Sequence, residues 1–257
     1  MCFGNITKVL TINLRYETEE DGPNNWPFRK NHLASLIKAL GPDIFGSQEG
    51  WEHQIEELQS LLSNYKFYVD APKGWNRRRM YPCVWVKKEK IEAEQVKTIW
   101  LSETPHLPHS KNWGSAFPRT LTYVVAKDTQ GKRFIFASTH LDHISEIARP
   151  NQARVLIDHL KDVSLPIILV GDFNAVPKSH EHEILTRHFQ DAWEMMGKGE
   201  TTTYCSFIGK DVKGRIDWIL ITPGIEVKEI EVIKKTFDGR YPSDHFPVVA
   251  SLKIPVK

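Results

Sequence analysis

Apolar runs that stop abruptly at polar residues recur along this chain. The clearest, Pro166-Ile167-Ile168-Leu169-Val170, ends at Gly171-Asp172-Phe173-Asn174, which predicts a buried strand with polar side chains at its end. If the alternation of a strand continues, Asp172 and Asn174 point one way and Phe173 points into the core. Because Gly, Asp and Asn are also the commonest turn residues, this stretch taken alone is more typical of an ordinary turn than of a functional site.

Further strands are predicted from short apolar or β-branched runs along the rest of the chain. Between residues 66 and 136 we find strands and loops without a convincing helix, so an antiparallel meander is expected there, with Gln130-Gly131-Lys132 as a hairpin turn. The predicted strands cover residues 8–14, 43–49, 67–69, 83–86, 98–101, 121–126, 134–137, 166–170, 215–221, 227–233 and 246–252.

Amphipathic helices precede and follow this β-rich middle, and residues 15–25 are predicted to form a polar loop. The apolar residues that define the helical faces are Leu33, Leu36, Ile37 and Leu40 in residues 27–40, then Trp51, Ile55, Leu58 and Leu62, then Ala153, Leu156, Ile157 and Leu160. This order predicts a four-layered α/β sandwich, in which two packed mixed sheets are flanked by helices. Since no repeat or Pro/Gly-rich linker divides the chain, residues 1–257 are expected to form a single domain.

Composition and charge narrow the function classes. The chain has 257 residues, is 40% hydrophobic and carries a net charge of +2, so any preference for a polyanion must be local. No window approaches the roughly 18 apolar residues of a membrane span, and we expect a cytoplasmic monomer, although a removed secretion signal would leave no trace. Cys2, Cys83 and Cys205 show neither a disulfide framework nor the spacing of a thiolate zinc site.

Polar residues that can carry chemistry follow the predicted strands. Strand ends converge at the edge of a sandwich, so these residues can meet in one pocket. Each of them alone can be interpreted as a cap or a turn, but that explanation must then be repeated at six places. The six sets are Asn13, Glu49, His140 with Asp142, Asp172 with Asn174, Asp217, and Asp244 with His245.

Asp217 indicates a specific pairing. It lies within Arg215-Ile216-Asp217-Trp218-Ile219, where its neighbours belong in a core, and a buried carboxylate is costly without a partner. A histidine is a suitable partner, and His245 is the candidate. After His140, strand alternation puts Asp142 on the same face, in a supporting role at most, and predicts that His143 points elsewhere.

Taken together, these motifs resemble the endonuclease/exonuclease/phosphatase superfamily, which has the DNase I-like fold. They occur in the order of that family and span essentially the whole chain. Residues 21–26 and 100–105 further resemble a subgroup of compact metal-dependent hydrolases similar to the deadenylase, nocturnin-like branch. The motifs are Thr11-Ile12-Asn13-Leu14-Arg15-Tyr16, Ser47-Gln48-Glu49, Ser138-Thr139-His140-Leu141-Asp142, Gly171-Asp172-Phe173-Asn174, Arg215-Ile216-Asp217-Trp218-Ile219 and Ser243-Asp244-His245-Phe246-Pro247-Val248.

The resemblance implies hydrolysis of a phosphate ester that depends on Mg²⁺ or Mn²⁺. Glu49 would be the main metal carboxylate, with Asn13 and Asp244 completing the site directly or through water. Oxygen ligands of this kind suit a hard divalent cation.

It also implies roles in catalysis. Asp172 would orient or deprotonate the attacking water, and Asn174 would hold that water or a phosphate oxygen. His245, backed by Asp217, and His140 would neutralise charge on the phosphoryl oxygens. Whether Asp172 or His245 is the general base stays open.

The sequence departs from the family before the predicted strand at residues 83–86. Relatives usually carry Gly-Glu where this chain has Arg78 and Arg79, so the acid that would help to hold His140 is absent. Arg77, Arg78 and Arg79 instead form a basic cluster near aromatic residues. It is either a solvated loop or a lip that binds phosphates and bases of a nucleic acid or nucleotide, and Arg119 can also reach a phosphate.

The expected function is a metal-dependent phosphodiesterase, most plausibly a nuclease acting on nucleic acid or nucleotides. The alternatives within the same fold are a phosphatase and a phospholipase of the sphingomyelinase type. A zinc hydrolase built on His140 and His143 lacks the usual spacing of paired histidine ligands. A binding module that has lost its chemistry is opposed by the retained Glu49, Asp172 and His245.

Overall fold

The computed structural model describes residues 6–71, 80–211 and 213–255, and in these residues twelve strands form two six-stranded sheets. The first sheet has the order β11-β12-β1-β2-β4-β3, in which β1 and β2 are parallel. Its strands are β1 (Ile6–Asn13), β2 (Ile44–Gln48), β3 (Tyr65–Tyr68), β4 (Cys83–Lys87), β11 (Glu226–Val232) and β12 (Val248–Lys253).

The second sheet has the order β5-β6-β7-β8-β10-β9, in which β7 and β8 are parallel. Both sheets are therefore mixed, as predicted. The strands are β5 (Ile91–Trp100), β6 (Thr120–Asp128), β7 (Arg133–His140), β8 (Ile167–Asp172), β9 (Gln190–Asp191) and β10 (Asp217–Ile221).

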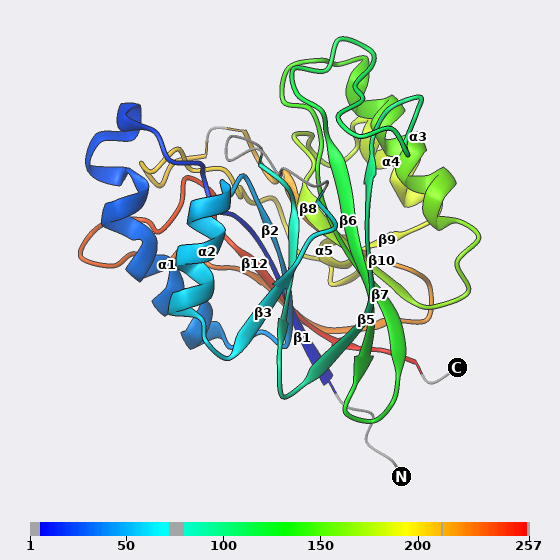
Figure 1. The fold of residues 1–257 in the computed structure, drawn as a ribbon, viewed down its shortest axis with the longest axis horizontal. Coiled ribbons are helices and arrows are strands. Elements are labelled where there is room, and N and C mark those ends of the chain that lie inside the picture. Colours follow the sequence, from blue (N-terminus) through cyan, green and yellow to red (C-terminus); the bar gives the residue numbers. More distant parts are fainter. Residues whose placement is uncertain (1–5, 72–79, 212, 256–257) are drawn as a thin grey trace.

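Helices cover the outer faces of the two sheets. Figure 1 shows α1 and α2 beside the first sheet and α3 and α4 beside the second, and the buried apolar side chains of each helix pair pack against the strands of the neighbouring sheet. A third apolar core, shared by the inner faces, joins the sheets. The four-layered sandwich is thereby confirmed. The helices are η1 (Glu19–Asn24), α1 (Trp26–Leu40), α2 (Glu52–Leu61), α3 (Ala148–Leu160), α4 (His180–Thr186) and α5 (Ala192–Met195).

Several local predictions differ from the structure. The antiparallel run β5-β6-β7 forms as expected, but β3 and β4 pair within the first sheet, so the predicted meander is divided between two sheets. The loop at residues 15–25 contains the short helix η1, which the Thr18 side chain caps. No described helix is long and apolar enough to cross a bilayer.

Two glycines allow backbones to approach closely near the functional strand ends. A Cβ atom at Gly46 of β2 would lie 2.6 Å from Cγ2 of Val170 in the opposite sheet. A Cβ atom at Gly171 of β8 would lie 2.1 Å from the carbonyl oxygen of Thr139 in the neighbouring strand. Since contacts this short force a backbone to move, glycine at these positions sets how closely β8 packs on its neighbours.

We therefore expect Gly171→Ala to lower the free energy of unfolding by at least about 2 kcal/mol, because the added methyl group pushes β7 and β8 apart. Chemical denaturation measures the change. Gly199→Ala is the matched control, since a Cβ atom there meets nothing within 4 Å. Equal stability of the two variants would show that the backbone spacing at Gly171 carries no constraint.

Candidate active site

The ends of β1, β2, β7 and β8 and the segment before β12 surround one cavity of about 460 Å³. Most of the residues singled out from the sequence line it. Asn13 and Asp217 lie buried next to these residues, and Arg77, Arg78 and Arg79 lie outside the described residues. The lining residues are Arg15, Tyr16, Glu49, Trp51, Met80, Phe117, Arg119, His140, His143, Asp172, Asn174, Tyr204, Lys213, Asp244 and His245.

Asp172, the last residue of β8, lies at the centre of this arrangement. Its Oδ2 atom accepts a hydrogen bond from Nδ2 of Asn13 at 3.0 Å. The same oxygen lies 3.4 Å from Nε2 of His140 and 3.8 Å from Nε2 of His245. Its Oδ1 atom accepts from the backbone N–H of Asn174 at 2.9 Å. Both sheets thus contribute partners to a single carboxylate.

The pKa of Asp172 is raised to about 6, first by burial and then by the neighbouring carboxylate of Asp217. These two residues are directly paired across the antiparallel strands β8 and β10. A carboxyl group with a pKa near 6 is ionised at neutral pH but binds a proton more strongly than an ordinary aspartate. It is therefore suited to accept a proton from water.

The predicted pairing of Asp217 with His245 is present. Nδ1 of His245 lies 2.8 Å from Oδ2 of Asp217, and both residues are buried. Burial pulls the pKa of His245 down, but the charge and hydrogen bond of Asp217, together with the charges of Asp172 and Asp244, outweigh burial and raise it well above the usual value. His245 is therefore an imidazolium at neutral pH, oriented with Nε2 towards Asp172.

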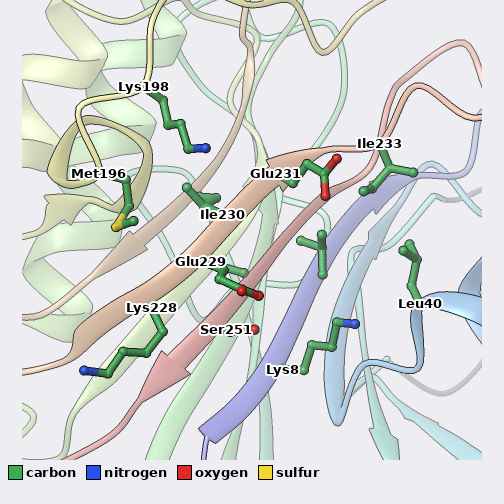
Figure 2. A pocket seen from close by; sticks show the side chains of 12 residues that line it. Lys8, Leu40, Met196, Lys198, Lys228, Glu229, Ile230, Glu231, Ile233 and Ser251 are labelled. Carbon is green, nitrogen blue, oxygen red and sulfur yellow. The ribbon is translucent and has the colours of Figure 1, made fainter.

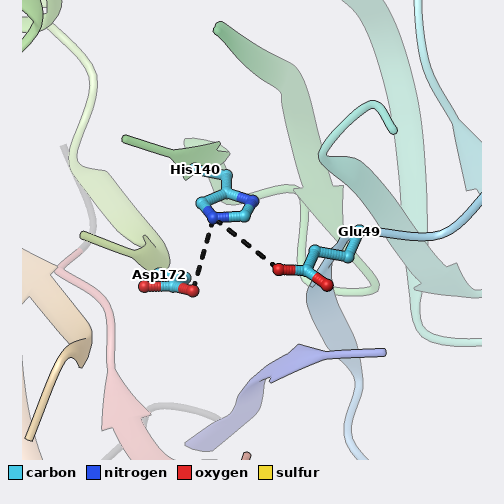
Figure 3. A group of neighbouring side chains, drawn as sticks. All are labelled: Glu49, His140 and Asp172. Carbon is cyan, nitrogen blue, oxygen red and sulfur yellow. Dashed lines mark ion pairs between the residues drawn. The ribbon is translucent and has the colours of Figure 1, made fainter. Parts of the chain in front are cut away.

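His140 carries the opposite protonation state. Its Nε2 atom lies 3.0 Å from the Nδ2 donor of Asn174, which also donates to the carbonyl oxygen of Leu141. Burial and then Arg119 lower the pKa of His140 well below the usual value, so the ring is neutral and Nε2 accepts. Its buried Nδ1 atom has no hydrogen-bond partner among the described residues. Figure 3 shows the ring between the side chains of Asp172 and Glu49. Its Nε2 atom lies 3.4 Å from Oδ2 of Asp172 and 4.0 Å from Oε1 of Glu49.

Left-handed backbone conformations bend the chain where strands end at the cavity. Arg15, Glu49 and Asn174 have φ angles of 55°, 64° and 49°, which are uncommon for residues other than glycine. Strained conformations of this kind persist where the surroundings hold them, often at functional sites. Asn174 therefore does not extend β8 as the alternation predicted, although Phe173 is buried as expected.

The carboxylates of Glu49 and Asp244 fit a divalent cation. Glu49 accepts a long 3.3 Å bond from the Tyr16 N–H. Buried Asp244 accepts a 3.3 Å bond from the Ser243 hydroxyl and lies 3.8 Å from Nε of Arg15. Burial and then the charge of Glu49 raise the pKa of Asp244. Ligand atoms of Glu49, His140 and Asp172 also lie within 4.8 Å of one another. A hard cation would satisfy these weakly bonded oxygens.

Asn13 has a positioning role in addition to the predicted role of metal ligand. Its Oδ1 atom accepts from the backbone N–H of Arg15 at 2.9 Å, while its Nδ2 atom donates to Asp172. These two contacts fix the amide orientation, and Asn13 thus positions Asp172. One lone pair on Oδ1 remains for a metal or a metal-bound water.

Arg29 of α1 holds this part of the site together, and the sequence analysis missed it. It is 2% exposed and donates to the carbonyl oxygens of Leu14, Arg15, Asn24 and Pro242. It thereby ties the end of β1 to the segment that carries the C-terminal site residues. The available signal was its position four residues before Leu33, on the apolar face of the helix.

Arg119 reaches the cavity as predicted, with His143 beside it. Nη2 of Arg119 lies 3.1 Å from Nδ1 of His143, and the His143 ring stacks on Phe117. The prediction that His143 points elsewhere is wrong, because β7 ends at His140 and its alternation does not continue. Buried Asp142 accepts bonds from neighbouring N–H groups and lies 3.8 Å from Arg119, which is the supporting position expected.

Other features of the described residues are less suited to this chemistry. A hollow of about 450 Å³ lies along β11, β12 and β1. Charges of both signs are mixed there (Figure 2), including Lys8, Lys228, Glu229 and Glu231.

Another group of potential metal ligands among the described residues contains His182, Asp191 and Glu194. There Arg215 already binds the Asp191 carboxylate at 2.8 Å, so a cation would have to displace an existing partner.

The Asp217–His245 pair leads to a direct test. We expect Asp217→Asn to lower the pKa of His245 by at least about one unit, because the opposing charge is lost while burial remains. NMR titration of the imidazole in metal-free protein measures it. Since the folded pKa is raised, the pair stabilises the fold below the unfolded value of about 6.5, and this stabilisation is lost as pH rises through the folded pKa. An unchanged titration would contradict the pairing.

A protein-family model and several solved structures are similar to this chain. The model of the Endonuclease/Exonuclease/phosphatase family matches residues 10–245. A family protein from Bacteroides vulgatus is 29% identical, with a TM-score of 0.91 over 98% of this chain and 100% of that chain. The mannosyl-6-phosphatase of Bacteroides thetaiotaomicron is 27% identical, with a TM-score of 0.88 over 96% and 99%.

The catalytic domain of human nocturnin shares the fold at 19% identity, with a TM-score of 0.76 over 97% of this chain and 94% of that chain. No curated protein matches the sequence. Because the family model covers most of the chain and the predicted strand ends meet in one cavity, the chain belongs to the endonuclease/exonuclease/phosphatase family.

Proposed function

We propose that this protein hydrolyses phosphodiesters of nucleic acids or nucleotides with the aid of Mg²⁺ or Mn²⁺. The observation that supports this most strongly is the grouping of Asp172, His245 and Glu49 around one cavity. In this group Asp172 is the proton acceptor, His245 is the positively charged side chain for the phosphoryl oxygens, and Glu49 is the carboxylate that would bind the metal. Burial and the neighbouring charges account for the raised pKa values of Asp172 and His245.

Glu49 and Asp244 would hold the metal, with Asn13 contributing through its remaining lone pair or through water. The donors are oxygens, as Mg²⁺ and Mn²⁺ prefer. When bound, the cation polarises the phosphoryl group and lowers the pKa of bound water.

The remaining side chains handle the proton and the phosphate charge. Asp172, with a pKa of about 6, accepts the proton of the attacking water. His245 is already protonated because of Asp217, which supports a role as donor to the phosphoryl oxygens and favours Asp172 as the base. The Asn174 amide, fixed between His140 and Leu141, holds the water or a phosphate oxygen.

Aromatic rings around the cavity support a nucleotide substrate. Tyr16 and Trp51 stack with their centroids 6.0 Å apart, and Phe117 and Tyr204 also line the walls. Rings beside a phosphate site provide stacking surfaces for bases. The proposed lip of Arg77, Arg78 and Arg79 stays a prediction.

A phosphatase for small phosphomonoesters is the second candidate. It is favoured by the 27% identical relative that is a mannosyl-6-phosphatase and that aligns over 99% of its length. A cavity of about 460 Å³ lies within the usual range for small-molecule sites, so its volume is compatible with both candidates.

Substrate class is tested by a screen of oligonucleotides, nucleotides, sugar phosphates and phospholipids with Mg²⁺ and Mn²⁺. We expect metal-dependent cleavage of oligonucleotides or nucleotide diesters, and a loss of at least about 100-fold in kcat for Asp172→Asn, because the proton acceptor is removed. Preferential release of phosphate from sugar phosphates would establish the second candidate instead. Absence of hydrolysis in every class would reject both.

Glu49→Gln tests the metal assignment. We expect the Mn²⁺ concentration for half-maximal activity to rise at least about tenfold, because a neutral amide is a weaker ligand for a hard cation. Activity is measured across a Mn²⁺ titration. Glu56→Gln, on the exposed part of α2, is the matched control and should behave as wild type. If Glu49→Gln retains wild-type metal dependence, Glu49 is not a ligand.

A further inference from the structure

Cations beside aromatic rings recur around the cavity. Each such pair fixes a long charged side chain at the wall, since a cation is attracted to the face of a ring. Among the described residues that line the cavity, the pairs are Arg15 over Tyr16 at 4.4 Å, Arg119 over Phe117 at 5.7 Å and Lys213 over Tyr204 at 4.9 Å.

The arginines of this set already have anionic partners. Arg15 binds Asp21 through two nitrogens at 2.8 and 2.9 Å, and the guanidinium of Arg119 lies 3.8 Å from Asp142. Lys213 is exposed and has no ion pair with a carboxylate in the part of the chain that the structure describes. Its charge is therefore available to a ligand.

Lys213 is placed close to the reacting groups. The ring of Tyr204 meets the His245 ring edge-on, with centroids 5.0 Å apart, and the Lys213 ammonium lies 4.9 Å from the Tyr204 centroid. The Lys213 ammonium is therefore no farther from the centre of the His245 ring than the sum of these two distances.

We propose that Lys213, held over Tyr204, binds a second anionic group of the substrate, namely a phosphate next to the scissile one. Successive phosphates of a nucleic acid strand are one nucleotide apart, roughly 3.4 Å along the helix axis. A bound strand can therefore present a second phosphate within the upper limit on the distance between Lys213 and the His245 ring. An ammonium group binds phosphate as a point charge. This inference rests on the proposed function and makes Lys213 a determinant of specificity for substrates with adjacent phosphates.

The protein should therefore prefer substrates with two adjacent phosphates over a sugar monophosphate, which has only one. In this arrangement His245, Arg119 and the metal that Glu49 and Asp244 would hold contact the scissile phosphate, and Lys213 contacts the second phosphate. Oligonucleotides and nucleoside bisphosphates carry both groups. Loss of Lys213 is therefore expected to remove the contact with the second phosphate, while the proposed contacts of His245 and Arg119 with the scissile phosphate are retained.

Equilibrium binding separates this inference from the catalytic proposal. The ligands are thymidine 3′,5′-bisphosphate and thymidine 5′-monophosphate, which differ only in the second phosphate, titrated by calorimetry with Mg²⁺ into the Asp172→Asn variant. We expect the bisphosphate to bind about tenfold more tightly, the size of one charge-assisted contact. Adding Lys213→Ala should remove this preference and leave the monophosphate affinity unchanged.

Lys210→Ala in the same background is the matched control, because Lys210 is also exposed in this loop but does not line the cavity. It should keep the preference. Equal binding of the two ligands, or a preference that survives Lys213→Ala, overturns the inference. A failure of the catalytic proposal is seen separately, as absence of metal-dependent hydrolysis by the wild-type protein.

Discussion

The burial of the Asp172 carboxylate between the two sheets is the constraint on which the rest of the site depends. An ionised carboxyl group taken out of water is costly unless hydrogen bonds and charges compensate it. Here the compensation comes from the amide of Asn13 in the first sheet, the backbone N–H of Asn174 after β8 and the charged ring of His245 before β12. Since these residues are far apart in the sequence, only the closed sandwich brings them together, and folding and assembly of the site are one event.

Much of this arrangement could be predicted from the sequence because it follows periodic patterns. The apolar runs give the strands, and the polar residues that end them, such as Glu49 and Asp172, converge wherever sheets pack face to face. The Asp217–His245 pair was predictable for an energetic reason, since an acid flanked by core residues needs a partner. These features depend on local pattern and burial, which the sequence carries directly.

The rest depends on geometry that periodicity does not describe. His143 lines the cavity because β7 ends at His140, and Lys213 reaches it from a loop through a contact with Tyr204. The buried position of Arg29 has meaning only once the carbonyl oxygens that it binds are in place. The assignment of β3 and β4 to the first sheet was likewise not predictable, since strand patterns do not specify which sheet a strand joins.

The central claim is that the converging strand ends form one metal-dependent site. Anomalous diffraction from crystals grown with Mn²⁺ tests it most directly, because the position of the ion is seen without reference to any substrate. The account predicts an ion in the cavity within bonding distance of the Glu49 and Asp244 carboxylates. An ion bound instead at His182, Asp191 and Glu194, with the cavity empty at saturating Mn²⁺, would contradict it.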